Sequence, residues 1–128
     1  MARILVVDDS ATMRQLLVAC LSPLSATCVE ASTGLEAVER LTVDAFDLVF
    51  LDVHMPDMDG VEVVGFLKRH PTLARIPVVM VTTRKDEVLR RRLAEQGVDR
   101  YITKPFVPRD ILEAARALLP AGAGSDSP

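Results

Sequence analysis

The chain has 128 residues, of which 49% are hydrophobic, and its formal net charge is −3. This length and apolar content are typical of one globular domain with its own core, and they exclude a largely disordered chain. The mild charge and the lack of a basic stripe with interleaved aromatic residues argue against direct binding to nucleic acid.

The first third of the chain alternates short apolar runs with helical patterns. Residues 4–7 are continuously apolar and predict a strand. Over residues 13–21 apolar side chains recur at helical spacing, and a proline soon afterwards ends that helix. Residues 27–31 alternate weakly, as a strand does. The Thr-Gly-Leu-Glu sequence that opens residues 33–41 has the form of a capping box and predicts a second helix.

The middle of the chain continues this alternation. A third strand is predicted at residues 48–51, which are apolar throughout. A loop over residues 52–59 follows it. A second box-like sequence, Asp-Gly-Val-Glu at residues 59–62, opens a helix that ends before Pro71. Residues 78–81 form the fourth apolar run and predict the fourth strand.

The last third contains two more helical patterns and one more strand. The helix over residues 86–96 has the thinnest apolar stripe, formed by Val88 and two leucines, and ends at a glycine suited to a left-handed cap. Residues 100–102 predict a short strand, and a proline opens the helix over residues 108–119. Residues 121–128, rich in Gly, Ala, Ser and Pro, are expected to be a flexible tail or the start of a linker.

Strict alternation of strands and helices over residues 1–120 predicts an α/β domain. Its sheet is expected to be doubly wound, five-stranded and parallel, with helices on both faces. The first, third and fourth runs are apolar throughout, as central strands are, whereas the second and fifth carry polar residues, as edge strands do. This distribution matches the order 2-1-3-4-5 known from flavodoxin-like folds, which we adopt rather than derive. In that order a crevice lies at the carboxyl ends of the first and third strands.

No signal for secretion or for a membrane was found in the sequence. No apolar run approaches the ~20 residues that span a bilayer, and the chain starts with a strand rather than a signal peptide. Cys20 and Cys28 fall on apolar faces of predicted elements, which favours reduced thiols over a disulfide. We therefore expect a soluble, cytoplasmic protein without membrane insertion, as a monomer or weak dimer.

Polar residues follow four of the predicted strands, at the edge of the sheet where the crevice lies. They are Asp8, Asp9, Asp52, Thr82, Thr83 and Lys104. Carboxylates about 4 Å apart repel by roughly 4 kcal/mol per pair at an effective dielectric of 20. That is a large share of the ~5–15 kcal/mol stability of a domain. A cation that prefers oxygen ligands would offset the repulsion, and a few carboxylates with water suit Mg²⁺.

These residue types favour phosphoryl transfer. A carboxylate such as Asp52 beside Mg²⁺ can act as a nucleophile toward a phosphoryl group. The reaction needs mainly positioning and charge neutralisation, which the metal and the Lys104 ammonium can supply. The Thr82 hydroxyl can hydrogen-bond a phosphoryl oxygen. Each residue alone is better explained as a helix cap or turn residue, so the hypothesis depends on their combination.

Four segments together resemble the receiver family of two-component signalling. The resemblance runs from Arg3 to about Leu119, nearly the whole chain. The segments are Val6-Val7-Asp8-Asp9-Ser10, Leu51-Asp52-Val53-His54-Met55-Pro56-Asp57-Met58-Asp59-Gly60, Val81-Thr82-Thr83 and Tyr101-Ile102-Thr103-Lys104-Pro105-Phe106.

The resemblance implies a metal-assisted phosphoacceptor. Asp52 would accept the phosphoryl group from a histidine kinase or phosphotransfer protein. Asp9, Asp52 and the backbone carbonyl of His54 would bind Mg²⁺ directly, and Asp8 would act through water. The domain would pass the signal to a downstream target protein that the sequence does not identify.

The resemblance also implies a switch. Thr82 matches the family's switch hydroxyl, and Lys104 matches its phosphate-contacting lysine, whose bond to Pro105 is commonly cis. Tyr101 matches a rotameric aromatic residue. Together with Phe106 it would belong to an output surface formed by the fourth helix, fifth strand and fifth helix.

Three residues depart from the family's common pattern or are thought to tune it. Thr83 stands where a smaller residue is frequent, and its bulk would narrow access to Asp52. His54 and Arg84 lie two residues beyond Asp52 and Thr82, at positions that tune phosphate lifetime in the family. Neither is an acid, and Arg84 cannot act as a base toward water, so we hypothesise a comparatively long-lived phosphorylated form.

Three other functions remain open at this point. A haloacid-dehalogenase-type phosphatase also forms an aspartyl-phosphate, but it needs a second aspartate where His54 stands. A binding module could keep the fold without being phosphorylated. A flavodoxin relative lacks support because no Gly-rich loop follows the first strand. We favour a signalling domain that is not an enzyme beyond its own phosphorylation and slow dephosphorylation.

Overall fold

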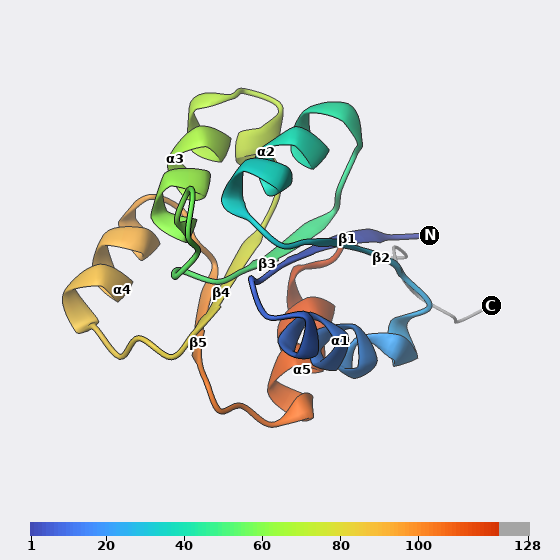
Figure 1. Cartoon of the computed structure of the whole chain (residues 1–128). Coiled ribbons are helices and arrows are strands. Elements are labelled where there is room, and N and C mark those ends of the chain that lie inside the picture. Colours follow the sequence, from blue (N-terminus) through green and yellow to red (C-terminus); the bar gives the residue numbers. More distant parts are fainter. Residues whose placement is uncertain (121–128) are drawn as a thin grey trace.

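The computed structural model describes residues 1–120 and confirms the α/β architecture, with five strands alternating with five α-helices (Figure 1). Residues 121–128, for which a tail or linker was expected, lie outside the described residues. The elements in chain order are β1 (Arg3–Val7), α1 (Ala11–Cys20), η1 (Ser22–Leu24), β2 (Thr27–Ala31), α2 (Gly34–Val43), β3 (Leu48–Leu51), α3 (Gly60–Arg69), η2 (Leu73–Arg75), β4 (Val78–Thr82), α4 (Glu87–Glu95), β5 (Arg100–Thr103) and α5 (Pro108–Leu118).

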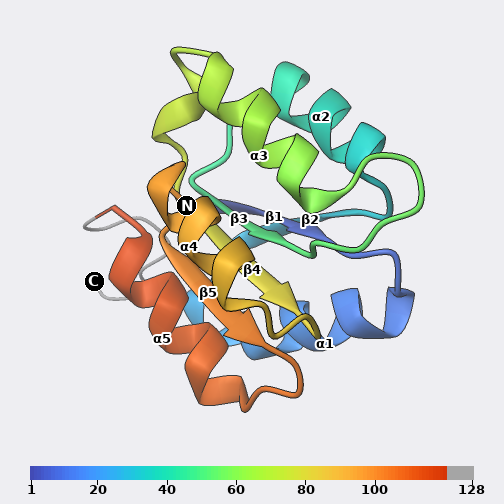
Figure 2. The ribbon, with the colours of Figure 1, turned by 90° about the vertical axis from the view of Figure 1, so that its left-hand side faces the viewer.

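The sheet has the expected order. Neighbouring strands all pair in parallel, in the order β2-β1-β3-β4-β5. The side view shows α2 and α3 above the sheet and α1 and α5 below it (Figure 2). Parallel pairing brings the carboxyl ends of all five strands to one edge of the sheet.

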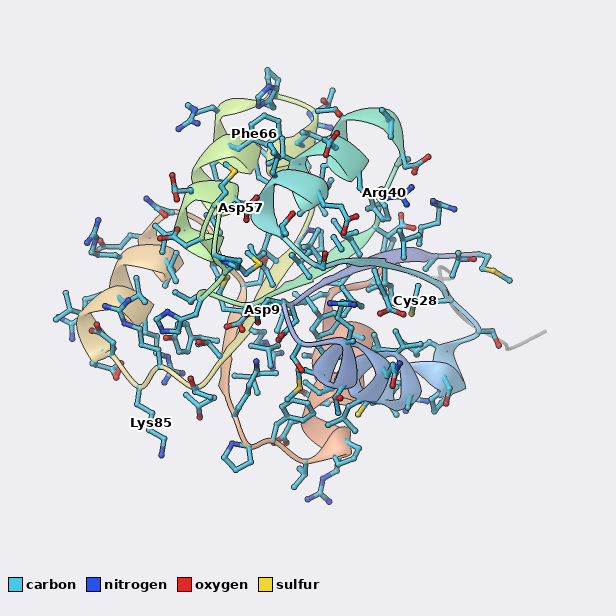
Figure 3. All side chains as sticks on the ribbon, in the orientation of Figure 1. Asp9, Cys28, Arg40, Asp57, Phe66 and Lys85 are labelled. Atoms are coloured by element: carbon cyan, nitrogen blue, oxygen red, sulfur yellow. The ribbon has the colours of Figure 1, made fainter. Side chains whose placement is uncertain are left out.

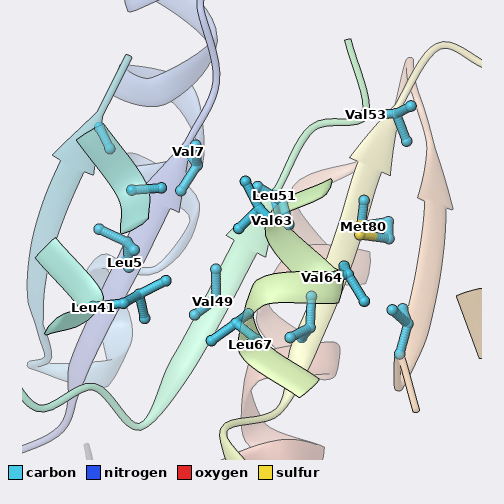
Figure 4. Close-up of a cluster of buried hydrophobic side chains, with 14 of the residues drawn as sticks. Leu5, Val7, Leu41, Val49, Leu51, Val53, Val63, Val64, Leu67 and Met80 are labelled. Atoms are coloured by element: carbon cyan, nitrogen blue, oxygen red, sulfur yellow. The ribbon is translucent and has the colours of Figure 1, made fainter. Parts of the chain in front are cut away.

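Two hydrophobic clusters, one on each face, hold the layers together. One joins the sheet to α2, α3 and α4 (Figure 4), and the other joins it to α1 and α5. Successive residues of a strand point to opposite faces, so Leu5 and Val7 enter the first cluster while Ile4 and Val6 enter the second. The residues of β3 and β4 are all buried, whereas β2 and β5 remain partly exposed, as expected for edge strands.

The two expected capping boxes differ in the structure. At α3 the box is complete, because the Asp59 carboxylate accepts from the Glu62 amide (2.9 Å) and Glu62 accepts from the Asp59 amide (3.1 Å). At α2 the Thr33 hydroxyl caps the Glu36 amide (3.0 Å). The Glu36 carboxylate, however, binds the amide of Ser32 rather than that of Thr33 (2.6 Å). The predicted hydrogen bond from the Thr33 amide to Glu36 is therefore replaced by one from the amide of the preceding residue, Ser32.

Helix α4 packs against the core through fewer apolar side chains than its sequence predicted. Leu89 and Leu93, one helical turn apart, are buried, but Val88 is 70% exposed. A residue adjacent to Leu89 in a helix points about 100° away from it, which turns Val88 toward solvent. The expected glycine cap is present, with Gly97 at φ 100°.

Both cysteines are free thiols, as expected. Cys20 is buried and Cys28 is half-buried. Desolvation raises the pKa of both thiols, which makes the reactive thiolate scarcer. Among residues 1–120 no helix combines the length and the apolar character needed to cross a bilayer.

Candidate functional site

Three carboxylates meet where β1 and β3 end. Asp8 and Asp9 follow β1, and Asp52 follows β3, its neighbour in the sheet. One oxygen from each carboxylate lies within 4.8 Å of the others. Asp8 is 1% exposed and Asp52 is 6% exposed, whereas Asp9 faces solvent at the turn into α1 (Figure 3). Two acids are therefore buried at close quarters beside a third that is accessible.

Lys104 supplies a positive charge to this cluster from the other side of β4. Its Nζ donates to Asp8 Oδ2 (2.7 Å) and Asp52 Oδ2 (3.2 Å), and its side chain is 12% exposed. Burial by itself lowers the pKa of Lys104, but the hydrogen bond to Asp8 and the charge of Asp52 outweigh it, so the pKa is raised. Lys104 is therefore a cation at neutral pH. The peptide bond from Lys104 to Pro105 is cis, as the family resemblance implied.

The loop after β3 is fixed closely to the site. The amide of His54 donates to Asp52 Oδ1 (3.3 Å), and the amide of Gly60 donates to the carbonyl of Val53 (2.8 Å). At Gly60 an added Cβ would overlap the backbone carbonyl oxygen of Asp52. A glycine is therefore required for α3 to begin this close to the acidic cluster.

Asp57, which sequence reasoning did not single out, ties the same loop to α2. Its carboxylate accepts from the amides of Gly34 (3.3 Å) and Leu35 (3.2 Å), the first residues of that helix. Desolvation acts to raise the pKa of Asp57, but hydrogen bonds from Met58, Leu35 and other amides lower it below its ordinary value. The negative charge is thus kept at the N-terminus of α2, where it is stabilised by the helix dipole.

Thr82 and Thr83 lie at the end of β4, between the strands that carry Asp52 and Lys104. Thr82 is fully buried, and its Oγ1 accepts from the amide of Arg84 (3.2 Å). Thr83, by contrast, is exposed. The structure therefore gathers Asp8, Asp9, Asp52, Thr82 and Lys104 at one sheet edge.

The side chains of His54 and Arg84 both face solvent. The Arg84 guanidinium pairs with Asp86 (3.0 Å). A hollow of about 370 Å³ lined by Asp9, His54, Met55, Pro56 and Asp59 opens beside the exposed carboxylate. A small ligand could reach the acidic cluster from this side.

Tyr101 lies apart from the cluster, in a groove beside α4. Its hydroxyl donates to the backbone carbonyl of Arg84 (2.6 Å), and the guanidinium carbon of Arg90 lies 6.0 Å from its ring centroid. Desolvation raises the pKa of the phenol. The groove, of about 580 Å³, also contains Arg100 and Glu113.

Phe106 does not line this groove. It is half-buried against the cluster that α1 and α5 share. Tyr101 thus borders the groove beside α4, while Phe106 packs against the α1 and α5 side of the sheet; their shared output surface stays a prediction.

The model of the response regulator receiver domain matches residues 4–116 of the chain. The chain belongs to the response regulator receiver family. Receiver domains are signalling domains of two-component systems.

Relatives and solved structures agree with this assignment. The transcriptional regulatory protein SrrA of Staphylococcus aureus is 38% identical over 116 residues, which cover 91% of this chain and 47% of SrrA. This receiver domain therefore spans about half the length of the curated relatives it matches. Chemotaxis protein CheY4 of Vibrio cholerae superimposes with a TM-score of 0.85 at 29% identity, over 93% of this chain and 99% of CheY4. The signal receiver domain of a histidine kinase from Syntrophus aciditrophicus superimposes with a TM-score of 0.85 at 33% identity. The superposition covers 100% of this chain and 97% of that domain.

One further residue of the receiver domain, Arg14, contacts the acidic rim, the sheet edge that carries Asp8, Asp9 and Asp52, without having been predicted. Arg14, in the first turn of α1, donates to the backbone carbonyl of Asp8 (2.7 Å) and to the Glu30 carboxylate (2.9 Å). The available signal was weak: a basic residue lies on the helix that directly follows the two acids. Which carbonyl it would reach depends on how α1 crosses the sheet, and local sequence does not encode that.

Proposed function

We propose that this receiver domain, residues 1–120, accepts a phosphoryl group on Asp52 in the presence of Mg²⁺. The donor would be a histidine kinase or a phosphotransfer protein. The observation that carries the proposal is the charge balance of the cluster, in which one ammonium faces three carboxylates. Two negative charges stay uncompensated beside largely buried groups, and a dication would neutralise them.

The ligand set fits Mg²⁺ because every available donor is an oxygen. Asp9 and Asp52 would hold the ion directly with the backbone carbonyl of His54, and Asp8 would act through water. None of these donors is the sulfur or imidazole nitrogen that zinc prefers. When bound, the ion supplies charge neutralisation for the phosphoryl oxygens.

The protein's own residues would take the remaining roles. A carboxylate oxygen of Asp52 attacks phosphorus, forming an oxygen–phosphorus bond while the bond to the donor nitrogen breaks. The Lys104 ammonium, already 3.2 Å from Asp52, is placed to contact a phosphoryl oxygen. The Thr82 hydroxyl accepts one hydrogen bond from the Arg84 amide and keeps its own proton to donate.

The same contacts support a route to an output surface around α4, β5 and α5. Thr82 binds the Arg84 amide and Tyr101 binds the Arg84 carbonyl, so both act on one residue. A shift of Thr82 toward a phosphoryl group would change the contact that holds the Tyr101 ring. Phosphorylation would then bias a pre-existing equilibrium of this surface for a downstream target protein.

The lifetime of the phosphoryl group is expected to be comparatively long. No acid stands at residue 54 or 84, and the Arg84 guanidinium, which cannot act as a base, pairs with Asp86. The decay of the phosphorylated protein after removal of the donor measures this lifetime. Location in the cytoplasm and a monomeric or weakly dimeric state also stay predictions.

The proposal is tested by treating the protein with acetyl phosphate or beryllium fluoride and Mg²⁺. The chain has one tyrosine and no tryptophan, so its fluorescence reports on Tyr101 alone. We expect a fluorescence change, and a mass gain of one phosphoryl group with acetyl phosphate. Asp52→Asn should abolish both responses, and Asp44→Asn, far from the cluster, should keep them. A wild-type protein with no response would favour the unphosphorylated binding module instead, whereas turnover of phosphomonoesters would favour the phosphatase.

A further inference from the structure

The guanidinium of Arg14 joins two strand ends at the acidic rim. Its Nη1 donates to the backbone carbonyl of Asp8 (2.7 Å), and its Nε donates to Glu30 Oε1 on β2 (2.9 Å). The Arg14 side chain is 16% exposed, so it is largely enclosed while making these contacts. None of the roles assigned so far uses Arg14 or Glu30.

The carbonyl that Arg14 binds controls how the chain leaves β1. It belongs to the same planar peptide unit as the amide of Asp9. The pairing of β1 with its neighbours ends at Val7, and within residues 1–120 no backbone amide donates to this carbonyl. The Arg14 guanidinium is therefore the group that holds this carbonyl, and with it the peptide plane from which Asp9 departs.

The rest of Asp8 is held independently. Its amide donates to the Ala31 carbonyl (3.1 Å), its Oδ1 accepts from the Ser10 amide (2.9 Å), and its Oδ2 accepts from Lys104. Loss of Arg14 would thus free the peptide between the two acids without removing the anchors of the Asp8 carboxylate. The effect should fall on Asp9.

We infer that Arg14, held in place by Glu30, is a positioning residue that orients Asp9 for binding a divalent cation. This inference rests on the proposed function, because Mg²⁺ is the cation concerned. Arginine suits the role because its planar guanidinium can donate to the Asp8 carbonyl and to the Glu30 carboxylate at the same time. A lysine ammonium is a single point charge and does not have this fixed, two-sided donor geometry.

The sign of the effect separates positioning from simple electrostatics. The positive charge of Arg14 near the acids opposes the approach of a cation, so its removal alone would strengthen Mg²⁺ binding. Positioning predicts the opposite: Arg14→Gln weakens Mg²⁺ binding by about tenfold, within the range of roughly 10–100-fold for groups that orient metal ligands. Arg14→Lys, which keeps the charge, should also weaken it.

The experiment titrates Mg²⁺ calorimetrically into the wild type, Arg14→Gln, Arg14→Lys and Glu30→Gln. Arg69→Gln, an exposed arginine at the far end of α3, is the matched control and should bind as the wild type does. The double variant Arg14→Gln/Glu30→Gln should bind no more weakly than Arg14→Gln, since both changes weaken the same chain of contacts. Affinity unchanged or increased in Arg14→Gln and Arg14→Lys would overturn the inference.

A second measurement needs no metal. The amide resonance of Asp9 in the metal-free protein should move in Arg14→Gln and in Glu30→Gln but not in Arg69→Gln. An unmoved resonance would contradict the positioning role even if Arg14→Gln proved too unstable for calorimetry, because Glu30→Gln alone decides it. A wild type that binds no Mg²⁺ would instead refute the proposed function, and this outcome is distinct from equal binding by the wild type and the variants.

Discussion

At the scale of single residues, Lys104 balances the charge of two carboxylates at once. It is the one cation that contacts the side-chain carboxylates of Asp8 and Asp52 within the described part of the chain, and both carboxylates are almost fully buried. Buried charges left without a partner cost several kcal/mol. Lys104 therefore stabilises the fold as well as the site, and the two contributions can be measured separately.

Replacement of Lys104 by methionine should lower the free energy of unfolding by about 3 kcal/mol without Mg²⁺, the lower end of the range for a broken buried pair. Urea denaturation measures this loss. Lys85→Met is the matched control, since Lys85 is exposed (Figure 3) and should change stability by less than about 0.5 kcal/mol. Equal losses in the two variants would show that the Lys104 contacts contribute little.

The same pair predicts a dependence on alkaline pH. The pKa of Lys104 is raised above its ordinary value of 10.5 in the folded protein. The stability it contributes is therefore fully present below pH 10.5 and is lost as the pH rises through the folded-state pKa. Lys104→Met should lack this part of the alkaline loss, and parallel denaturation series above pH 10 would reveal the difference.

At the scale of elements, the N-termini of α2 and α3 both pack closely against the loop that begins at Asp52. A Cβ on Gly34 would overlap the Met58 carbonyl, and one on Gly60 would overlap that of Asp52. The capping box of α3 and the Asp57 contact to α2 fix the same loop. These contacts hold the backbone of Asp52 in place.

We expect Gly60→Ala to destabilise the protein by about 1–3 kcal/mol, as overpacking does, although alanine favours helix over glycine. Gly65→Ala is the matched control on the same helix. A Cβ there would meet only Arg69 Nη1 at 3.3 Å, so the change should be neutral or stabilise by up to about 1 kcal/mol. Thermal unfolding of both variants compares them, and destabilisation by Gly65→Ala alone would contradict the packing argument.

The elements themselves were predictable because their signals are local. Strand ends gave the positions of Asp8, Asp52 and Lys104, and the Asp59 box marked α3 correctly. Contacts that depend on how one element crosses another were missed: the half-box at α2, the exposure of Val88 and the Arg14 bridge. Sequence periodicity gives the face of a helix but not the identity of the group opposite it.

At the scale of the whole molecule, the sheet order decides which residues meet. Composition separated central strands from edge strands, but the order itself was adopted from known folds. The order places β1 beside β3 and sets β4 between β3 and β5, so residues distant in sequence converge. Ligand binding at that rim should therefore be linked to unfolding of the whole domain.

Mg²⁺ should raise the free energy of unfolding by about 2.7 kcal/mol at a concentration of roughly 100 times its Kd. Removal of the ion with a chelator should reverse the gain. Asp9→Asn, which removes the charge of the exposed carboxylate, should reduce the gain, whereas Asp44→Asn should retain it. A urea midpoint that does not depend on Mg²⁺ in the wild type would contradict specific binding to the folded state.

The bond between Lys104 and Asp8 joins residues 96 positions apart. During synthesis the first acid leaves the ribosome long before its counter-ion is made. Until residue 104 has emerged, Asp8 and Asp52 lack the ammonium that contacts both carboxylates in the folded protein. The charge balance of this edge of the sheet is therefore completed only after β5, the last strand of the sheet, has been made.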